Sequence, residues 1–400
     1  MSCDVLGNQI SAKDTQTLSG INAFILGYLG YDLRLVEILA TADQSEDCLA
    51  NTYAGLLWML SETGDVPAEA CRYRDRAKAG LADALPREGF LLSVLEAWID
   101  NDPDRIVRLT DAILAEWPRD LVTLKLRQYH DFIRGRFGDM LTLARRSEEA
   151  AGDIAALHGM LAFAFEQCHD LEAAERSARQ ALDMDPAEPW AQHALAHVFL
   201  THGRIEEGVA FLEGKSSGWS HLTSFMYTHL WWHLALFYLA QNRVDEALEV
   251  YDRHCWSRER SFSQDQIGAV SLLVRLELAG AKVGERWSDL GEWLAPRQND
   301  VSQPFLSLQY LYGLLKAGRP EGDRLYQRIE ELSDEILPDQ RAWELVGIPL
   351  ARGLKAYVAQ NFVAAREYFE RALPHIQDIG GSHAQRDLFT QIHRDTERHL

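Results

Sequence analysis

Four histidines occur as two pairs with the same spacing, His193-x-x-x-His197 and His229-x-x-x-His233. Residues four apart lie on one face of a helix, so each pair is expected to present two imidazoles side by side. Imidazole is the commonest metal ligand in proteins, and it titrates near neutral pH. The two pairs are therefore the first candidates for chemistry in this chain.

Three interpretations of the pairs compete. The histidines are structural and satisfied by hydrogen bonds, or they bind a polar or anionic small molecule or a peptide carboxylate, or they supply four nitrogen ligands to a metal. The pattern H-E-x-x-H of zinc proteases is missing, because Ala194 and Leu230 stand where the glutamate would be. The metal interpretation therefore ranks third, and the sequence requires no cofactor.

Three further side chains are candidates for the same site. Glu166 could orient a histidine or act as a general base, and a solvated groove charge is the simpler alternative. Trp232 lies between His229 and His233 in the sequence and could stack on a ligand. His254 occupies a position where the repeat usually has alanine, so a large polar group there needs a partner in a structural or a binding role.

A second polar cluster lies near the C-terminus, after the glycines Gly380 and Gly381. A helix is expected to start at Ser382-x-x-Gln385, which forms a capping box. Exposed backbone amides at such a start could hold an anion. An ordinary helix start explains only part of the cluster, so ligand contacts are assigned to four residues: His383, Gln385, Arg386 and Asp387.

The composition excludes some partners. The chain has 400 residues and a formal net charge of −20, from 60 acidic and 40 basic residues. Nucleic acid and anionic membranes need a basic surface, so neither is expected as a partner. The five cysteines are widely spaced and odd in number, which suits free thiols in the cytoplasm. Neither a signal peptide nor a membrane span is expected from the sequence.

Apolar residues recur at helical spacing along almost the whole chain. Leu161 and Phe165, then Leu195 and Phe199 34 residues later, begin successive units of one repeat. This pattern resembles tetratricopeptide repeats. It predicts an all-α fold, a right-handed α-solenoid of helix pairs with a concave groove. Four regions are expected: a loosely ordered stretch 1–18, degenerate repeats at 19–153, clear repeats at 154–256, and C-terminal repeats at 257–400.

Six short phrases, in order, resemble the tetratricopeptide repeat protein 38 family over roughly residues 120–395. They lie at residues 190–197, 229–236, 251–254, 284–287, 347–350 and 380–387. The resemblance implies a helical solenoid in a cytoplasmic protein and no settled activity. The chain departs from the family phrase F-x-D-x-H at Ser307 and Gln309, and has Gly268 where the family has an aspartate.

Two functions follow as hypotheses. In one, the solenoid binds a polar or anionic small molecule in a histidine-lined pocket, with the histidines available for acid–base catalysis. This predicts that His193, His197, His229 and His233 converge on one enclosed cavity with His383 or Arg386. In the other, the chain is a non-enzymatic scaffold for a peptide or protein, and the groove is open. Whether the chain is an enzyme and its oligomeric state stay open at this point.

Overall fold

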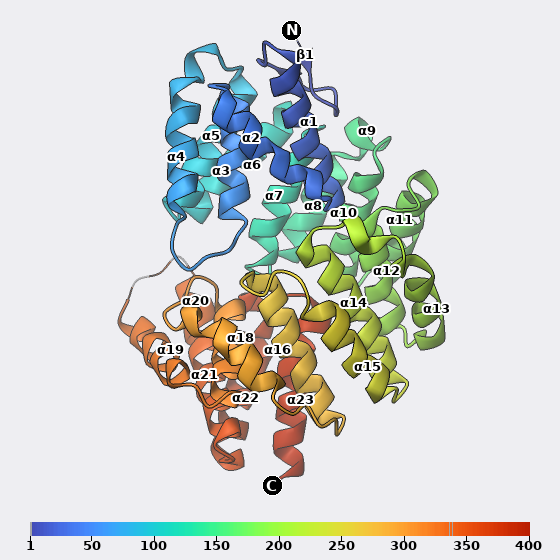
Figure 1. The fold of residues 1–400 in the computed structure, drawn as a ribbon, viewed down its shortest axis with the longest axis vertical. Helices are drawn as coiled ribbons and strands as arrows, with labels where there is room; N and C mark the ends of the chain where they lie inside the picture. The colour runs from blue at the N-terminus through green and yellow to red at the C-terminus, as the bar shows by residue number, and fades with distance from the viewer. Residues whose placement is uncertain (1, 336, 338) are drawn as a thin grey trace. The chain divides into compact units, whose positions relative to one another are not determined.

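The structure, a computed structural model, describes residues 2–335, 337 and 339–400 (Figure 1). The all-α class predicted from the sequence is confirmed, because helices make up most of the described chain and the strands are two short segments. The strands among the described residues are β1 (Ser2–Cys3) and β2 (Gln9–Ile10), which pair antiparallel with Ser2 opposite Ile10. No helix in this part of the chain is long and apolar enough to cross a membrane.

The chain divides into two compact units. The first comprises Met1–Asp131, Phe137–Val198 and Ser220–Thr223, and the second comprises Phe132–Arg136, Phe199–Trp219 and Ser224–Leu400. The helices of the first unit are α1 (Thr15–Gly30), α2 (Glu37–Gln44), α3 (Cys48–Met59), α4 (Ala68–Ala79), α5 (Pro86–Ile99), α6 (Pro103–Glu116), α7 (Leu121–Phe132), α8 (Phe137–Arg146), α9 (Glu148–Ala151), α10 (Ala155–Gln167), α11 (Leu171–Met184) and most of α12 (Pro189–Thr201). Short 3₁₀ turns at Leu33–Val36 and Leu81–Asp83 complete it.

The second unit continues the same helical pattern. Its α-helices are α13 (Ile205–Ser216), α14 (Ser224–Ala240), α15 (Val244–Val250), α16 (Ser263–Leu278), α17 (Arg286–Leu294), α18 (Pro304–Lys316), α19 (Pro320–Glu331), α20 (Gln340–Ala342), α21 (Ile348–Val358), α22 (Phe362–Ala372) and α23 (His383–Arg398). Two π-helical turns, η4 (Tyr251–Cys255) and η7 (Trp343–Gly347), continue α15 and precede α21. Its 3₁₀ turns are Ala295–Arg297, Leu332–Asp334 and Leu373–Ile379, while the turn Trp219–His221 has Trp219 in this unit and its other two residues in the first.

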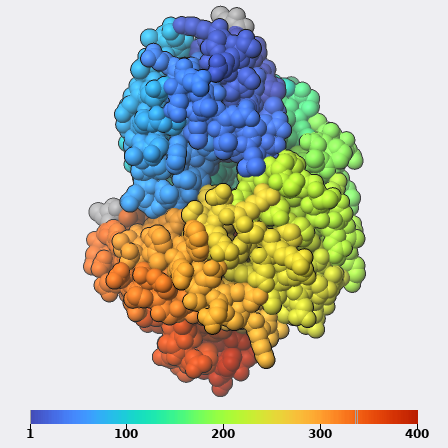
Figure 2. Space-filling view, viewed as in Figure 1, coloured from blue at the N-terminus to red at the C-terminus, as the bar shows by residue number. Residues whose placement is uncertain are grey.

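A buried ion-pair group holds the N-terminal segment of the first unit. The Arg87 guanidinium donates to Asp4 at 3.1 Å and to Asp120 at 2.9 Å, and all three side chains are buried. Around them, α1, α3 and α5 share one apolar core. On the face shown in Figure 2, the blue N-terminal residues of this unit form a closely packed surface. The segment before α1 is thus fixed by charge as well as by the strand pair.

Close packing of helix pairs in the second unit depends on small residues. Gly208 on α13 faces the Phe237 ring on α14, and a Cβ at Gly208 would lie 2.2 Å from that ring. Such a distance is far inside normal contact, so α13 and α14 approach this closely only with glycine at the position. Gly214 on the same helix has nothing within 4 Å of a built Cβ.

We predict that Gly208→Ala lowers the free energy of unfolding by about 1–3 kcal/mol, because the new methyl group overpacks the contact with Phe237. Chemical denaturation measures it. Gly214→Ala is the matched control, and it should raise stability by up to about 1 kcal/mol through helix propensity. Equal effects of the two substitutions would contradict the packing account.

Candidate functional site

The start of α12 places the first histidine pair. The carboxylate of Glu188, just before this helix, accepts a hydrogen bond from the backbone amide of Ala191. Gly159 on α10 makes room for it, since a Cβ there would lie 2.7 Å from Glu188 Oε2. Burial raises the pKa of Glu188 and lowers the pKa of Lys125, and the opposite charges of the two groups counteract these shifts. Glu188 thus fixes the first turn of α12, and His193 and His197 follow on the next turns.

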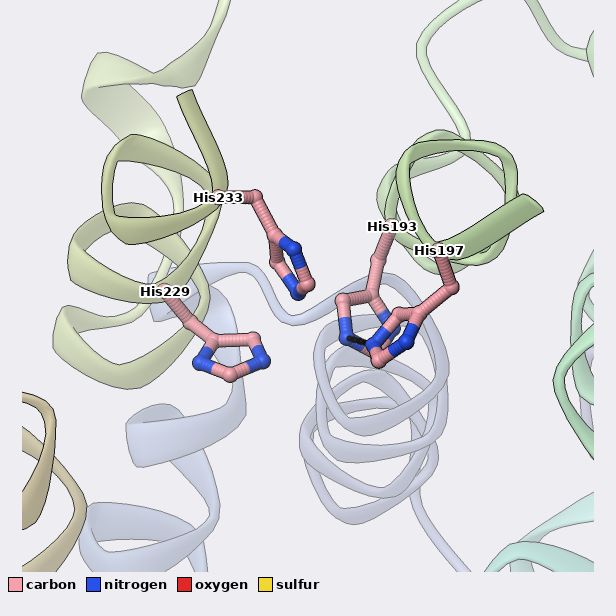
Figure 3. Close-up of side chains that lie close together, drawn as sticks. All are labelled: His193, His197, His229 and His233. Atoms are coloured by element: carbon pink, nitrogen blue, oxygen red, sulfur yellow. Dashed lines mark hydrogen bonds between the residues drawn. The ribbon is translucent and has the colours of Figure 1, made fainter. Parts of the chain in front are cut away.

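Within the first unit, His193 and His197 form a contact with each other and with Glu166. Figure 3 shows both imidazoles projecting from one helix, and their Nε2 atoms are 3.0 Å apart. The Nδ1 atom of His197 lies 3.6 Å from Glu166 Oε1. The amide of Gln167 donates to the other oxygen of Glu166. Both histidines and Glu166 are about 1% exposed, so this is an interior polar group.

Aromatic rings surround this first pair. Trp190 stacks on His193 with ring centroids 4.4 Å apart, and Phe163 contacts His193 at 5.2 Å and His197 at 5.8 Å. Trp190 also contacts Tyr31, whose ring lies 3.4 Å from the Lys125 ammonium. These aromatic rings fix the orientation of the imidazoles, and they give their surroundings a low dielectric constant.

The second pair lies on α14 in the second unit. Figure 3 shows His229 and His233 on one helix, and their rings meet edge-to-face with centroids 4.8 Å apart. The His229 ring stacks on Trp232 at 5.3 Å and on Phe225 at 5.2 Å. Burial lowers the pKa of His229 to about 3, so the side chain is neutral at physiological pH. That the two pairs serve one site stays a prediction from their spacing, since they belong to different units.

A pocket in the second unit has His229 and Trp232 in its wall. The space around it is about 210 Å³ including open solvent, so the enclosed part is far smaller than the usual 300–1,000 Å³ of small-molecule sites. Its other lining residues come from α16, α18 and α23: Gln264, Ile267, Gly268, Ser271, Gln309 and Gln385. The C-terminal cluster therefore reaches the second histidine pair through Gln385. Gly268 and Gln309, two of the three departures noted in the sequence, line the same pocket.

Arg275 on α16 holds the residues of this pocket wall in place through hydrogen bonds. It donates to the Ser271 hydroxyl oxygen, to the Ser271 carbonyl at 3.2 Å and to the Ala384 carbonyl at 2.6 Å. Its guanidinium lies 5.4 Å from the Trp232 ring centroid. Burial lowers the pKa of Arg275 to about 10, against the opposing effect of Asp387, so the group stays cationic. One buried arginine thus joins α14, α16 and α23.

Sequence reasoning did not select Gln264, Ser271 or Arg275. A signal was present, because Gln264, Gly268, Ser271 and Arg275 recur every three or four residues and share one face of α16. A charged residue inside the apolar run around Leu273 and Leu276 also indicates a buried partner.

The remaining C-terminal candidates bond among themselves. The predicted capping box is confirmed, with Ser382 accepting from the Gln385 amide and Gln385 accepting from the Ser382 amide. Arg386 donates to the Gly381 carbonyl, and its guanidinium lies 3.0 Å from His383 Nδ1. The Gln391 side chain donates to Asp387. Of the four candidates in this cluster, Gln385 is the one in the pocket wall.

His254 lies on the π-helical turn η4, against other partners. Its ring stacks on Trp231 with centroids 3.6 Å apart, and its Nδ1 atom lies 2.7 Å from the Tyr227 hydroxyl. His254 is not among the residues lining the pocket. His254 thus has its partners, Tyr227 and Trp231, on the neighbouring helix α14, which is what a structural role requires.

Comparisons with known proteins give short or weak similarities. No protein-family model matches the chain. A stretch of 63 residues, 16% of this chain, is 40% identical to cellulose synthase operon protein C of Pseudomonas fluorescens (strain SBW25) and spans 5% of that protein. A chain in the structure of Naa15/Naa10 bound to HypK-THB aligns with 96% of this chain and 64% of its own length, at 15% identity and a TM-score of 0.27. That score is too low to support an argument, and the fold class rests on the helices themselves.

We predict that stability falls as the pH drops below about 6.5, in part through His229. Its pKa is about 3 in the folded chain and 6.5 ordinarily, so the unfolded state binds the proton first. The loss from this group is at most about 1.4 kcal/mol per pH unit, and it stops near pH 3.

The free energy of unfolding is measured at pH 7 and at pH 5. This window includes the pKa of a histidine in the unfolded chain. His229→Gln should make this drop smaller, and His375→Gln, at an exposed histidine of the same unit, should leave it unchanged. An identical pH dependence in wild type and His229→Gln would show that His229 is not held neutral by folding.

Proposed function

We propose that this helical-repeat protein binds the polar or anionic end of a small molecule in the pocket of the second unit. One observation carries the proposal: polar side chains from α14, α16, α18 and α23, far apart in the sequence, line one pocket beside an indole ring. Small-molecule sites are usually concave, with a few convergent polar groups that fix the orientation of the ligand. The enclosed space is close to that of one water molecule, so a ligand would place only a terminal oxygen or nitrogen atom there.

The hydrogen-bonding groups of the wall favour this ligand chemistry. Since Arg275 donates to Ser271 Oγ, the Ser271 hydroxyl proton is available to an acceptor in the pocket. The Gln385 carbonyl oxygen is used by the helix cap, which leaves its NH₂ group for the ligand. The lining residues include no carboxylate, and the cation of Arg275 lies directly behind Ser271. Donors backed by a positive charge stabilise an acceptor or an anion.

The low pKa of His229 supports binding over acid–base catalysis at this pocket. An efficient general base has a pKa near the working pH, whereas that of His229 is about 3. Neutral His229 serves as a hydrogen-bonding and stacking group. We therefore propose that His229 binds the ligand and does not act as the acid or base first considered.

A second candidate function is a scaffold for a peptide or protein. The small enclosed volume of the pocket favours it, since only the end of a side chain or of a terminal carboxylate of a longer partner would enter. In that case the polar side chains of the pocket would bind one residue of the peptide, and neighbouring helices would contact the rest of it.

We predict that small carboxylates and primary amides bind to the full chain and that Gln309→Leu and Ser271→Ala weaken this binding about tenfold each. Each substitution removes a hydrogen-bonding group worth about 1–1.5 kcal/mol from the wall. Saturation-transfer NMR with a panel of small acids and amides gives the affinities, and circular dichroism checks the fold.

The matched control is Gln327→Leu, at an exposed glutamine of α19 in the same unit, and it should bind like wild type. If no compound of the panel binds, or if binding is unaffected by both pocket substitutions, the small-molecule proposal is wrong. Binding of peptides alone, weakened by Gln309→Leu, would establish the scaffold function instead.

A further inference from the structure

We propose that the first unit contains a binding site for a divalent transition-metal ion, with His193 and His197 as ligands and Glu166 as the residue that orients His197. The pocket proposed above lies in the second unit, and the metal proposal does not depend on it. The three residues come from two helices, α10 and α12, of one compact unit.

The nitrogen geometry is the first argument. A first-row metal binds imidazole nitrogen at about 2.0–2.1 Å, so two nitrogens on one ion lie roughly 3.0–3.4 Å apart. The Nε2 atoms of His193 and His197 are 3.0 Å apart, and they come from adjacent turns of one helix. Figure 3 shows the two rings next to each other, with a dashed line joining these nitrogens. The side chains thus need little movement to bind one ion, once the proton between the two Nε2 atoms has moved to Nδ1 of His193.

Glu166 supplies the second argument. Ligand histidines usually direct their other ring nitrogen toward a carboxylate, which fixes the tautomer and makes the ligand more basic. His197 Nδ1 faces Glu166 Oε1 at 3.6 Å, on the side of the ring opposite Nε2. With the proton on Nδ1, the lone pair of Nε2 points toward His193. Gln167, by donating to the other oxygen of Glu166, holds the carboxylate in place.

Burial sets the charge balance and the kind of ion. Both histidines and Glu166 are about 1% exposed, and Trp190 and Phe163 cover the imidazoles. An anionic carboxylate in such surroundings is stabilised by a nearby cation. Nitrogen ligands suit zinc, copper, iron and nickel, whereas magnesium and calcium require oxygen ligands. Two imidazoles leave further coordination positions for other donors.

The test uses Zn²⁺ alone with the full chain after treatment with a chelator. We predict that calorimetric titration gives one tight site, that His193→Gln and His197→Gln each weaken it more than about 100-fold, and that Glu166→Gln weakens it about 10–100-fold. The matched control is His254→Gln, at a histidine stacked on Trp231 outside the site, which should bind Zn²⁺ like wild type.

X-ray absorption of the zinc-loaded wild-type chain provides a readout that does not depend on variants folding. At least two imidazole nitrogens at about 2.0 Å are expected in the first coordination sphere. The proposal is overturned if wild type binds Zn²⁺ no more tightly than His193→Gln does, or if the bound zinc has fewer than two imidazole ligands.

Discussion

The hydrogen bond from the backbone amide of Ala191 to the buried Glu188 side chain is the interaction on which the first candidate site depends. An interior charge is costly unless it is paired and hydrogen-bonded. Glu188 meets this requirement by capping the first turn of α12 and by lying near Lys125, whose positive charge opposes the rise that burial causes in the pKa of Glu188. Because α12 is fixed at its start, the imidazoles one and two turns later have defined positions.

An interior charge that must be hydrogen-bonded also occurs in the second unit, at Arg275. Its guanidinium has three acceptors on two helices, and its position near Trp232 links it to a third. The arginine therefore aligns the polar face of α16 with the start of α23. A pocket wall made from four helices is a consequence, since side chains on separate helices keep a common geometry only when the helices are joined.

The environments of the two histidine pairs favour different chemistry. His193 and His197 face each other at hydrogen-bonding distance with a carboxylate behind one of them, an arrangement suited to a cation. His229 lies against Trp232 and beside glutamine and serine side chains, and burial keeps it neutral. A neutral imidazole in a wall of uncharged donors suits recognition of a polar group. The two pairs thus share one sequence spacing but have different immediate neighbours.

The sequence by itself determined the local features. Helical spacing of apolar residues predicted the all-α class, the spacing of four placed each histidine pair on one helix face, and Ser382 with Gln385 predicted the cap of α23. These features depend on residues within a few positions of each other. Only the tertiary structure decided that Gln385 joins His229, that Ser271 and Gln309 complete the wall, and that His254 packs on Trp231 instead. Contacts between residues tens to hundreds of positions apart depend on how helices pack, which periodicity within one helix does not encode.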